Sequence, residues 1–361
     1  MRDRWRLLLA AAVMVLSVWP ASVRAQDGSA AQADVFVGVD PDTGEASVYF
    51  VDALSGLSTV VAAPSGSRFT LVGDYVLYEK QQSGAVMRAR SDGILEPHPF
   101  IRRGVDVVSV AWVTSPDRQS IAWVTVSASG ASAAYVARAD GSELRQLPIT
   151  TPAAPLTLAP VALWDDLGRF VYDAAHAPES SGSPFVVYDH LVAYDMPTAT
   201  FIDLPQEPNC PCGAAFSADG RIFARLEAAE GRGPFALHVW DLPTGADIVI
   251  PAPDLPYRLA GDLILNDVGT LAAYGVAAQV EAEDGALVEQ YALALVDIVA
   301  QQQYAVLSPG PARYRPLAFI DGDDALLLVG VSEGRTYKLS LTTGELRPVA
   351  DKLYLGRIAA P

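Results

Sequence analysis

Few residues in this sequence have the types and spacing that catalysis or metal binding requires. The four histidines (His98, His176, His190 and His238) lie far apart, and no H-E-x-x-H sequence would place two on one helix face. The G-x-S-x-G turn that presents a nucleophilic serine does not occur either. We therefore expect no catalytic residue, no metal and no cofactor.

Two acidic stretches could supply oxygen ligands for calcium. They are Asp40-Pro41-Asp42-Thr43-Gly44-Glu45 and Asp321-Gly322-Asp323-Asp324. Both coincide with expected hairpin turns, where aspartate and glycine are common for conformational reasons. Turn formation is the favoured interpretation, and calcium binding is the alternative.

Sulfur chemistry is confined to Cys210-Pro211-Cys212. In an oxidising compartment two thiols this close tend to oxidise, so a local disulfide between Cys210 and Cys212 is the favoured interpretation. Free or intermolecular thiols and a redox pair are the alternatives.

A candidate interaction face comes from arginine, tyrosine and histidine in connecting segments. Guanidinium groups bind through planar forks and tyrosine through a rigid ring, which suits an interface. The alternative is that these are ordinary solvated loop residues. The candidate residues are Arg102, Arg103, His176, His190, Tyr257, Arg258, Arg313, Tyr314 and Arg315.

The elements that would position these side chains are short β-strands. The stretch from Val107 to Leu147 contains four β-branched or aromatic runs separated by turns, including Ser115-Pro116-Asp117 and Asp140-Gly141. Such an antiparallel unit cannot bury both faces alone, so copies must stack.

The turn between the third and fourth strands recurs seven times. It ends near Gly56, Gly93, Gly141, Ala199, Gly245, Gln301 and Gly344. The six intervals from Gly56 to Gly344 average 48 residues, which is typical of one propeller blade. The turn between the first and second strands recurs six times. The first unit lacks its copy, while LYLGRIAA remains unassigned at residues 353–360. We predict an all-β, seven-bladed propeller of four-stranded antiparallel blades, with Leu353–Ala359 closing the first blade.

At these residues the chain resembles a known family. Ser115-Pro116-Asp117 followed by IAW, then YVARADG and LRQL, resembles the WD40-like repeat of TolB-type periplasmic propellers. Ser217-Ala218-Asp219-Gly220 repeats that pattern, and the strand LHVWDLPTG carries the Trp240-Asp241 dipeptide. Arg118 and Gln119 replace the turn glycine in the first of these units. The resemblance implies a propeller fold, and the family's functions range from protein docking to carrying an enzyme domain.

The N-terminal residues indicate where the protein is located, and the net charge limits which partners it can bind. Residues 1–25 have a basic start, an apolar run and small residues before a cleavage point, as in a secretory signal; a membrane anchor is the alternative. Removing their four arginines and one aspartate takes the formal charge from −17 to −20. A surface of that sign repels nucleic acids and anionic membranes.

These features predict three segments: a signal peptide at residues 1–25, a short linker at 26–34 and one propeller domain at 35–361. We expect a secreted or periplasmic monomer that acts as a non-catalytic scaffold binding a protein, a polysaccharide or another ligand. The alternative is an extracytoplasmic hydrolase or lyase with carboxylates in the central funnel, although no paired acid and base motif is evident.

Overall fold

The computed structural model describes residues 32–149, 157–176, 183–205, 212–228, 235–252, 257–281 and 287–359. The predicted signal peptide, residues 1–25, and most of the predicted linker lie outside these ranges. In the described ranges no helix has the length and apolar character needed to cross a bilayer.

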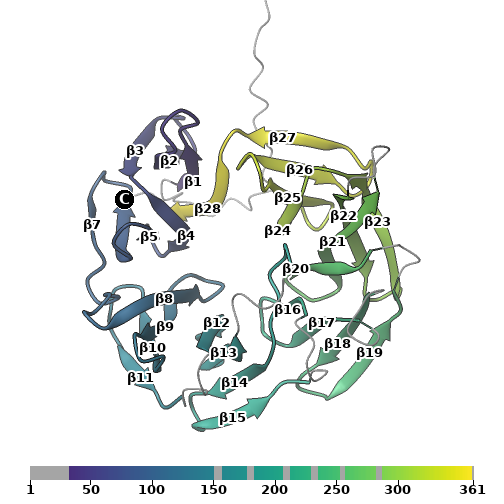
Figure 1. Ribbon diagram of the computed structural model, residues 1–361, viewed down its shortest axis with the longest axis horizontal. Helices are drawn as coiled ribbons and strands as arrows, with labels where there is room; N and C mark the ends of the chain where they lie inside the picture. Colours follow the sequence, from purple (N-terminus) through teal and green to yellow (C-terminus); the bar gives the residue numbers. More distant parts are fainter. Residues whose placement is uncertain are drawn as a thin grey trace, which may run out of the picture. The chain divides into compact units, whose positions relative to one another are not determined.

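The described strands form seven four-stranded antiparallel sheets arranged in a ring, which confirms the predicted propeller (Figure 1). Blade 1 contains β28, β1, β2 and β3, and blades 2 to 7 take the following strands four at a time, from β4–β7 to β24–β27.

The first, innermost strands are β28 (Leu353–Ala359), β4 (Gly66–Val72), β8 (Val107–Thr114), β12 (Thr157–Trp164), β16 (Ala214–Phe216), β20 (Leu259–Leu265) and β24 (Tyr314–Ile320). The second strands are β1 (Gln32–Val39), β5 (Tyr75–Lys80), β9 (Ser120–Ser127), β13 (Arg169–His176), β17 (Ile222–Ala228), β21 (Leu271–Glu281) and β25 (Ala325–Gly330). The third strands are β2 (Ala46–Asp52), β6 (Ala85–Arg90), β10 (Ser132–Arg138), β14 (Leu191–Asp195), β18 (Phe235–Asp241), β22 (Leu287–Asp297) and β26 (Thr336–Ser340). The outermost strands are β3 (Ser58–Ala63), β7 (Leu95–Pro97), β11 (Arg145–Leu147), β15 (Thr200–Asp203), β19 (Ala246–Ile250), β23 (Gln302–Gly310) and β27 (Leu346–Ala350).

The depth of each strand in its blade explains its sequence. In the second strands the side chains on both faces of the sheet are covered by neighbouring blades, so their sequences are continuous apolar runs. All six residues of β25, ALLLVG, are buried. In third strands such as β10, SAAYVAR, buried residues largely alternate with half-buried ones. In the outermost strand β15 all four residues are exposed. Burial on both faces therefore selects the β-branched and leucine-rich runs that made the blades recognisable.

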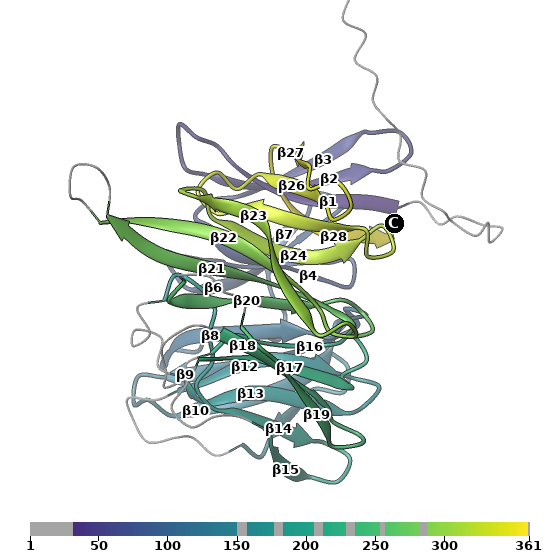
Figure 2. The same ribbon diagram turned by 90° about the vertical axis from the view of Figure 1, so that its right-hand side faces the viewer.

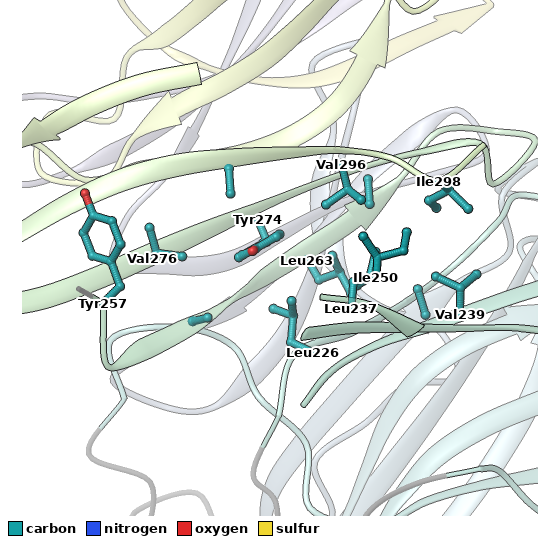
Figure 3. Close-up of a cluster of buried hydrophobic side chains, with 14 of the residues drawn as sticks. Leu226, Leu237, Val239, Ile250, Tyr257, Leu263, Tyr274, Val276, Val296 and Ile298 are labelled. Atoms are coloured by element: carbon teal, nitrogen blue, oxygen red, sulfur yellow. The ribbon is translucent and has the colours of Figure 1, made fainter. Parts of the chain in front are cut away.

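Clusters of buried side chains fill the interfaces between successive blades from blade 1 to blade 7. Between blades 5 and 6, Leu226, Leu237 and Ile250 face Leu263, Tyr274 and Val296 (Figure 3). Each blade thus completes its core with side chains from its neighbours, which is why the ring must close.

Closure brings the two ends of the described chain together. β28 pairs antiparallel with β1, from Gln32 opposite Ala359 to Val37 opposite Leu353, which confirms the predicted closing strand. Arg357 donates to both carboxylate oxygens of Asp34, at 2.8 and 3.0 Å, and the Tyr354 hydroxyl donates to the same group at 3.1 Å. Residues 32–34, predicted as linker, therefore belong to β1.

The connections divide between two faces of the ring. We call the face with the first-to-second and third-to-fourth turns of each blade the turn face, and the opposite face the loop face. Figure 2 shows the β21–β22 hairpin extending beyond the neighbouring strands.

Candidate binding site

The turn face holds a cleft of about 840 Å³ between blades 2 and 3 and the inner strand β28. Its walls are the first turns of the two blades, the last turn of blade 3, and the ends of β6 and β28. We call it the arginine cleft, because five arginines line it. The lining residues are Gly73, Asp74, Tyr75, Arg88, Arg90, Asp117, Arg118, Gln119, Arg138, Ala139, Asp140, Ser142, Glu143, Arg357, Ile358 and Ala359.

Four of these arginines pair with carboxylates. Arg88 donates to Glu96 at 2.7 Å, and Arg90 lies 3.0 Å from Asp92. Arg138 pairs with Asp165, and Arg357 holds Asp34. Two lining carboxylates are also engaged in their own turns: Asp117 accepts from the Ser115 hydroxyl at 2.6 Å, and Asp140 accepts from the Ser142 hydroxyl at 2.7 Å.

Arg118 differs from the other four. Its φ is 62°, in the left-handed region that costs a non-glycine residue about 1 kcal/mol or more. The matching turn position in blade 5 is Gly220, with a φ of 66°, and in blade 6 it is Gly269, with a φ of 73°. An arginine therefore occupies a backbone position suited to glycine.

The Arg118 guanidinium extends across to the closing strand. It donates to the Arg357 carbonyl at 2.9 Å and lies over Gly356, where an added Cβ would come within 2.5 Å of the guanidinium. Partial burial lowers the pKa of Arg118, but a guanidinium remains protonated at neutral pH. Within the described ranges, no carboxylate pairs with this group.

A buried hydrogen-bond network connects Tyr75 and Ala139, which line the cleft, with His98, which lines a cleft on the loop face. The His98 Nδ1 accepts from the Ile101 N–H at 3.0 Å, so in the neutral ring Nε2 carries the proton and donates to the Tyr75 hydroxyl at 3.0 Å. That hydroxyl donates to the Ala139 carbonyl at 3.2 Å, joining blades 2 and 3. Burial, with the nearby Arg88 charge, lowers the pKa of His98 to about 3, so the ring is neutral and structural.

A second cavity, of about 410 Å³, lies among the inner strands of blades 3 to 7. Its lining is mainly apolar, and its polar side chains are Thr114, Ser115, Arg118, Tyr188 and Ser217. Among the described residues that line it, none is a carboxylate or a histidine. Paired acid and base groups, expected here if the funnel were catalytic, are not present in this lining.

Two predicted interface residues, Arg102 and Arg103, lie in the exposed connection after β7, on the loop face. Arg102 donates to the Pro99 carbonyl at 2.8 Å. Arg103 donates to the carbonyls of Val107, at 2.8 Å, and Ser83, at 3.0 Å. Both arginines line a separate cleft of about 700 Å³ on the loop face. Part of the hydrogen-bonding capacity of both guanidinium groups is therefore taken by backbone carbonyls of the same chain.

The other predicted arginines and tyrosines range from exposed to buried. Tyr257 is buried, Arg258 is exposed, and Arg315 is half-buried in β24. Tyr314 packs edge-on against Tyr337.

Arg313 has a structural role. It lies 2.7 Å from the buried carboxylate of Asp262 and over the Phe185 ring, with 19% of its side chain exposed. It is not a solvated charge at a loop tip.

Of the predicted histidines and cysteines, the side chains of His190 and Cys212 are described. His190 is exposed, with its Nε2 4.0 Å from Asp203, and the side chain of His176 lies outside the described residues. Cys212 is disulfide-bonded, but Cys210 lies outside the described ranges, so the pairing of these two residues stays a prediction. In the described part of the chain no group of three or more His, Cys, Asp or Glu side chains could hold a metal.

The acidic stretch at residues 40–45 forms a turn. The Asp40 Oδ1 accepts from the backbone N–H groups of Asp42 and Thr43, both at 2.9 Å, and these bonds lower the pKa of Asp40. The hydrogen bonds of Asp40 within its own turn account for this aspartate without a calcium ion.

The arginine cleft is not among the sites that the sequence predicted. One signal was visible: Arg118 stands where the equivalent turns carry glycine. The partner surfaces come from residues remote in sequence, such as Arg357, which local patterns cannot place beside blade 3.

Comparison with protein-family models gives no match, and comparison with curated proteins gives none. Among solved structures, the chain is similar to an oligogalacturonate lyase in complex with manganese, with a TM-score of 0.55, 11% identity and coverage of 85% of this chain and 96% of that one. It is similar to the β-propeller domain of the Trilobed protease from Pyrococcus furiosus, with a TM-score of 0.53, 11% identity and coverage of 88% and 91%. It also matches TolB from Acinetobacter baumannii with a TM-score of 0.43 and 15% identity, over 79% of this chain and 65% of TolB.

At these identities the likeness shows the fold alone. The chain is a β-propeller, and its fold-level resemblance to a β-propeller domain of known structure is confirmed. It spans slightly less than two thirds of the TolB chain.

Proposed function

We propose that this protein is an extracytoplasmic, non-catalytic propeller that binds a partner protein at the arginine cleft on its turn face. The observation that carries the proposal is the gathering of five arginines around one cleft of about 840 Å³ on a chain of formal charge −17. Arginine is favoured at protein interfaces because its planar fork binds carboxylates and its stem covers apolar surface.

The turn face is a stronger candidate than the loop face. Of the loop-face arginines, Arg103 is bonded to carbonyls on both sides of its connection, and Arg313 is held by Asp262. In the cleft, Arg118 is half-buried and has no paired carboxylate among the described residues. A partner would gain most from a cation that is already positioned and not yet neutralised.

The alternative, an enzyme with its site in the central funnel, has less support. Hydrolases and lyases commonly use positioned carboxylates or histidines, and the described lining of the 410 Å³ cavity among the inner strands contains neither. The likeness to the lyase carries its fold and not its chemistry.

The extracytoplasmic location rests on the sequence of residues 1–25. Mass spectrometry of the protein from its native host should find a mature chain starting near Gln26. An intact Met1 in a soluble cytoplasmic fraction would contradict this location.

The binding face can be tested by a bulky substitution in the cleft. Gln119 is exposed and lines the cleft, so Gln119→Trp should block entry without disturbing the core. The matched control is Gln82→Trp, which places the same side chain on the exposed β5–β6 turn of the loop face. Both variants should melt within a few degrees of the parent, because exposed substitutions usually change stability by about 0.5 kcal/mol or less.

The measurement is recovery of bound proteins from native envelope or culture extract by immobilised mature protein. We expect Gln119→Trp to lose partners that Gln82→Trp retains. Equal recovery by both variants, or loss only with Gln82→Trp, would place the interface elsewhere.

A further inference from the structure

We propose that Arg118 is a carboxylate-binding anchor, and that the arginine cleft receives a peptide segment of a partner protein with one acidic side chain directed at this residue. The inference rests on the proposed function, because it names the chemistry of the partner at the same site.

The first argument is the backbone. Arg118 adopts a φ of 62°, where the equivalent residues of blades 5 and 6 are Gly220 and Gly269. Glycine adopts this conformation without steric cost, whereas arginine does not. Strain of this kind persists when the surrounding structure enforces it, and it gathers at ligand sites.

The second argument is the space made for the side chain. Gly356 of β28 has a φ of 132°, and any Cβ there would overlap the Arg118 guanidinium. A single hydrogen bond, 2.9 Å long, fixes one edge of that group on the Arg357 carbonyl. The guanidinium is therefore positioned before any ligand arrives, which reduces the entropy lost on binding.

The third argument is charge. Arg88, Arg90, Arg138 and Arg357 each have a carboxylate partner. Arg118 has no carboxylate partner among the described residues. Each nitrogen of its side chain is either hydrogen-bonded or accessible to solvent. Its remaining donors are therefore open to solvent between the arginine cleft and the 410 Å³ cavity among the inner strands, both of which Arg118 lines. A carboxylate matches the remaining donors of a planar guanidinium in geometry and charge.

The lining favours a peptide over other anions. Its one aromatic side chain, Tyr75, is buried, so no exposed ring is available to pack on a sugar or a base. Asp74 and Glu143 also line the cleft and would repel a densely charged polyanion. A segment of mixed charge, with one acidic residue at Arg118 and basic residues near these carboxylates, fits the pattern.

The test uses the mature protein labelled with ¹⁵N, following the Arg118 Nε–H signal during titration. The probe is a hexapeptide with blocked ends and one central glutamate, and its control has glutamine in place of glutamate. Inorganic phosphate and galacturonate are titrated separately. We expect a saturable shift with the glutamate peptide, at least about tenfold weaker binding of the glutamine peptide, and weaker binding of the other two anions.

Two variants accompany the titration, with binding followed by the signals of the neighbouring backbone amides. Arg118→Gly restores the glycine of the equivalent turns and should abolish peptide binding while the fold is kept. Arg118→Lys keeps the charge, loses the planar fork, and should bind at least about threefold more weakly than the parent.

Each outcome bears on the proposal. Equal binding of both peptides, tighter binding of phosphate or galacturonate, or unchanged binding by Arg118→Gly would overturn the anchor. If Gln119→Trp loses natural partners while Arg118→Gly retains them, the proposed function stands and the anchor fails. If both variants retain them, the proposed function fails.

Discussion

Replacing Arg313 with alanine should destabilise the propeller far more than loss of an ordinary surface arginine. Its guanidinium lies 2.7 Å from Asp262, whose side chain is 1% exposed. The substitution would leave that carboxylate buried with a hydrogen bond from the Val186 N–H at 3.0 Å and no positive partner. The lost packing on Phe185, where the guanidinium lies 5.0 Å from the ring centre, adds to the effect.

The magnitude follows from burial. Breaking a buried ion pair by removing one partner costs about 3–5 kcal/mol. Arg313 retains 19% exposure and Asp262 keeps one hydrogen bond, so we expect the lower end, about 3 kcal/mol. The matched control is Arg335→Ala, which removes a 3.1 Å pair with Asp351 whose side chains are 48% and 76% exposed. That change should cost about 0–1 kcal/mol.

The assay is urea unfolding followed by tryptophan fluorescence, with free energies compared at a common slope. Asp262→Asn provides a second check, because asparagine tolerates the positive φ of 52° at this position and can still accept from Val186. Adding Arg313→Met to Asp262→Asn should cost less than the sum of the two single changes. A loss below about 1 kcal/mol for Arg313→Ala, equal to the control, would refute the reasoning.

Three further predictions concern closure, pH and backbone strain. A chain ending at Asp351 lacks β28 and exposes the edge of β1, so its calorimetric melting temperature should fall by at least ~10 °C; an unchanged temperature would show that β28 does not hold the ring. The unfolded His98 pKa is about 6.5 and the folded value is about 3, so the unfolded chain binds the extra proton between these pH values and stability should fall as pH decreases through this window, by up to about 1.4 kcal/mol per unit. His98→Gln should flatten that slope in unfolding curves recorded from pH 7 to pH 4, and an identical slope would exclude His98 as its source. Arg118→Gly should raise the unfolding free energy by about 1 kcal/mol by relieving the positive φ, and a large loss instead would mean that the Arg357 contact outweighs the strain.

The sequence alone determined the blade count and the closure of the ring. Turns such as Asp140-Gly141 and Ser217-Ala218-Asp219-Gly220 have local causes, because aspartate and serine bond to nearby backbone and glycine supplies positive φ. Apolar runs such as ALLLVG report burial on both faces wherever they occur. The first blade had only three predicted strands, and the LYLGRIAA segment was a predicted strand without a blade. Pairing that segment with the first blade completes all seven blades.

The tertiary structure decided which charges are exposed and which are paired. Arg313 and Arg118 are both arginines in connecting segments, yet one is held by Asp262 and the other reaches Arg357, 239 positions along the chain. No local pattern encodes these contacts, because they arise when the closed ring brings blade 3 beside β28 and blade 6 beside blade 7. Burial and pairing depend on the whole fold, and they turn similar side chains into a structural ion pair in one place and a candidate anchor in the other.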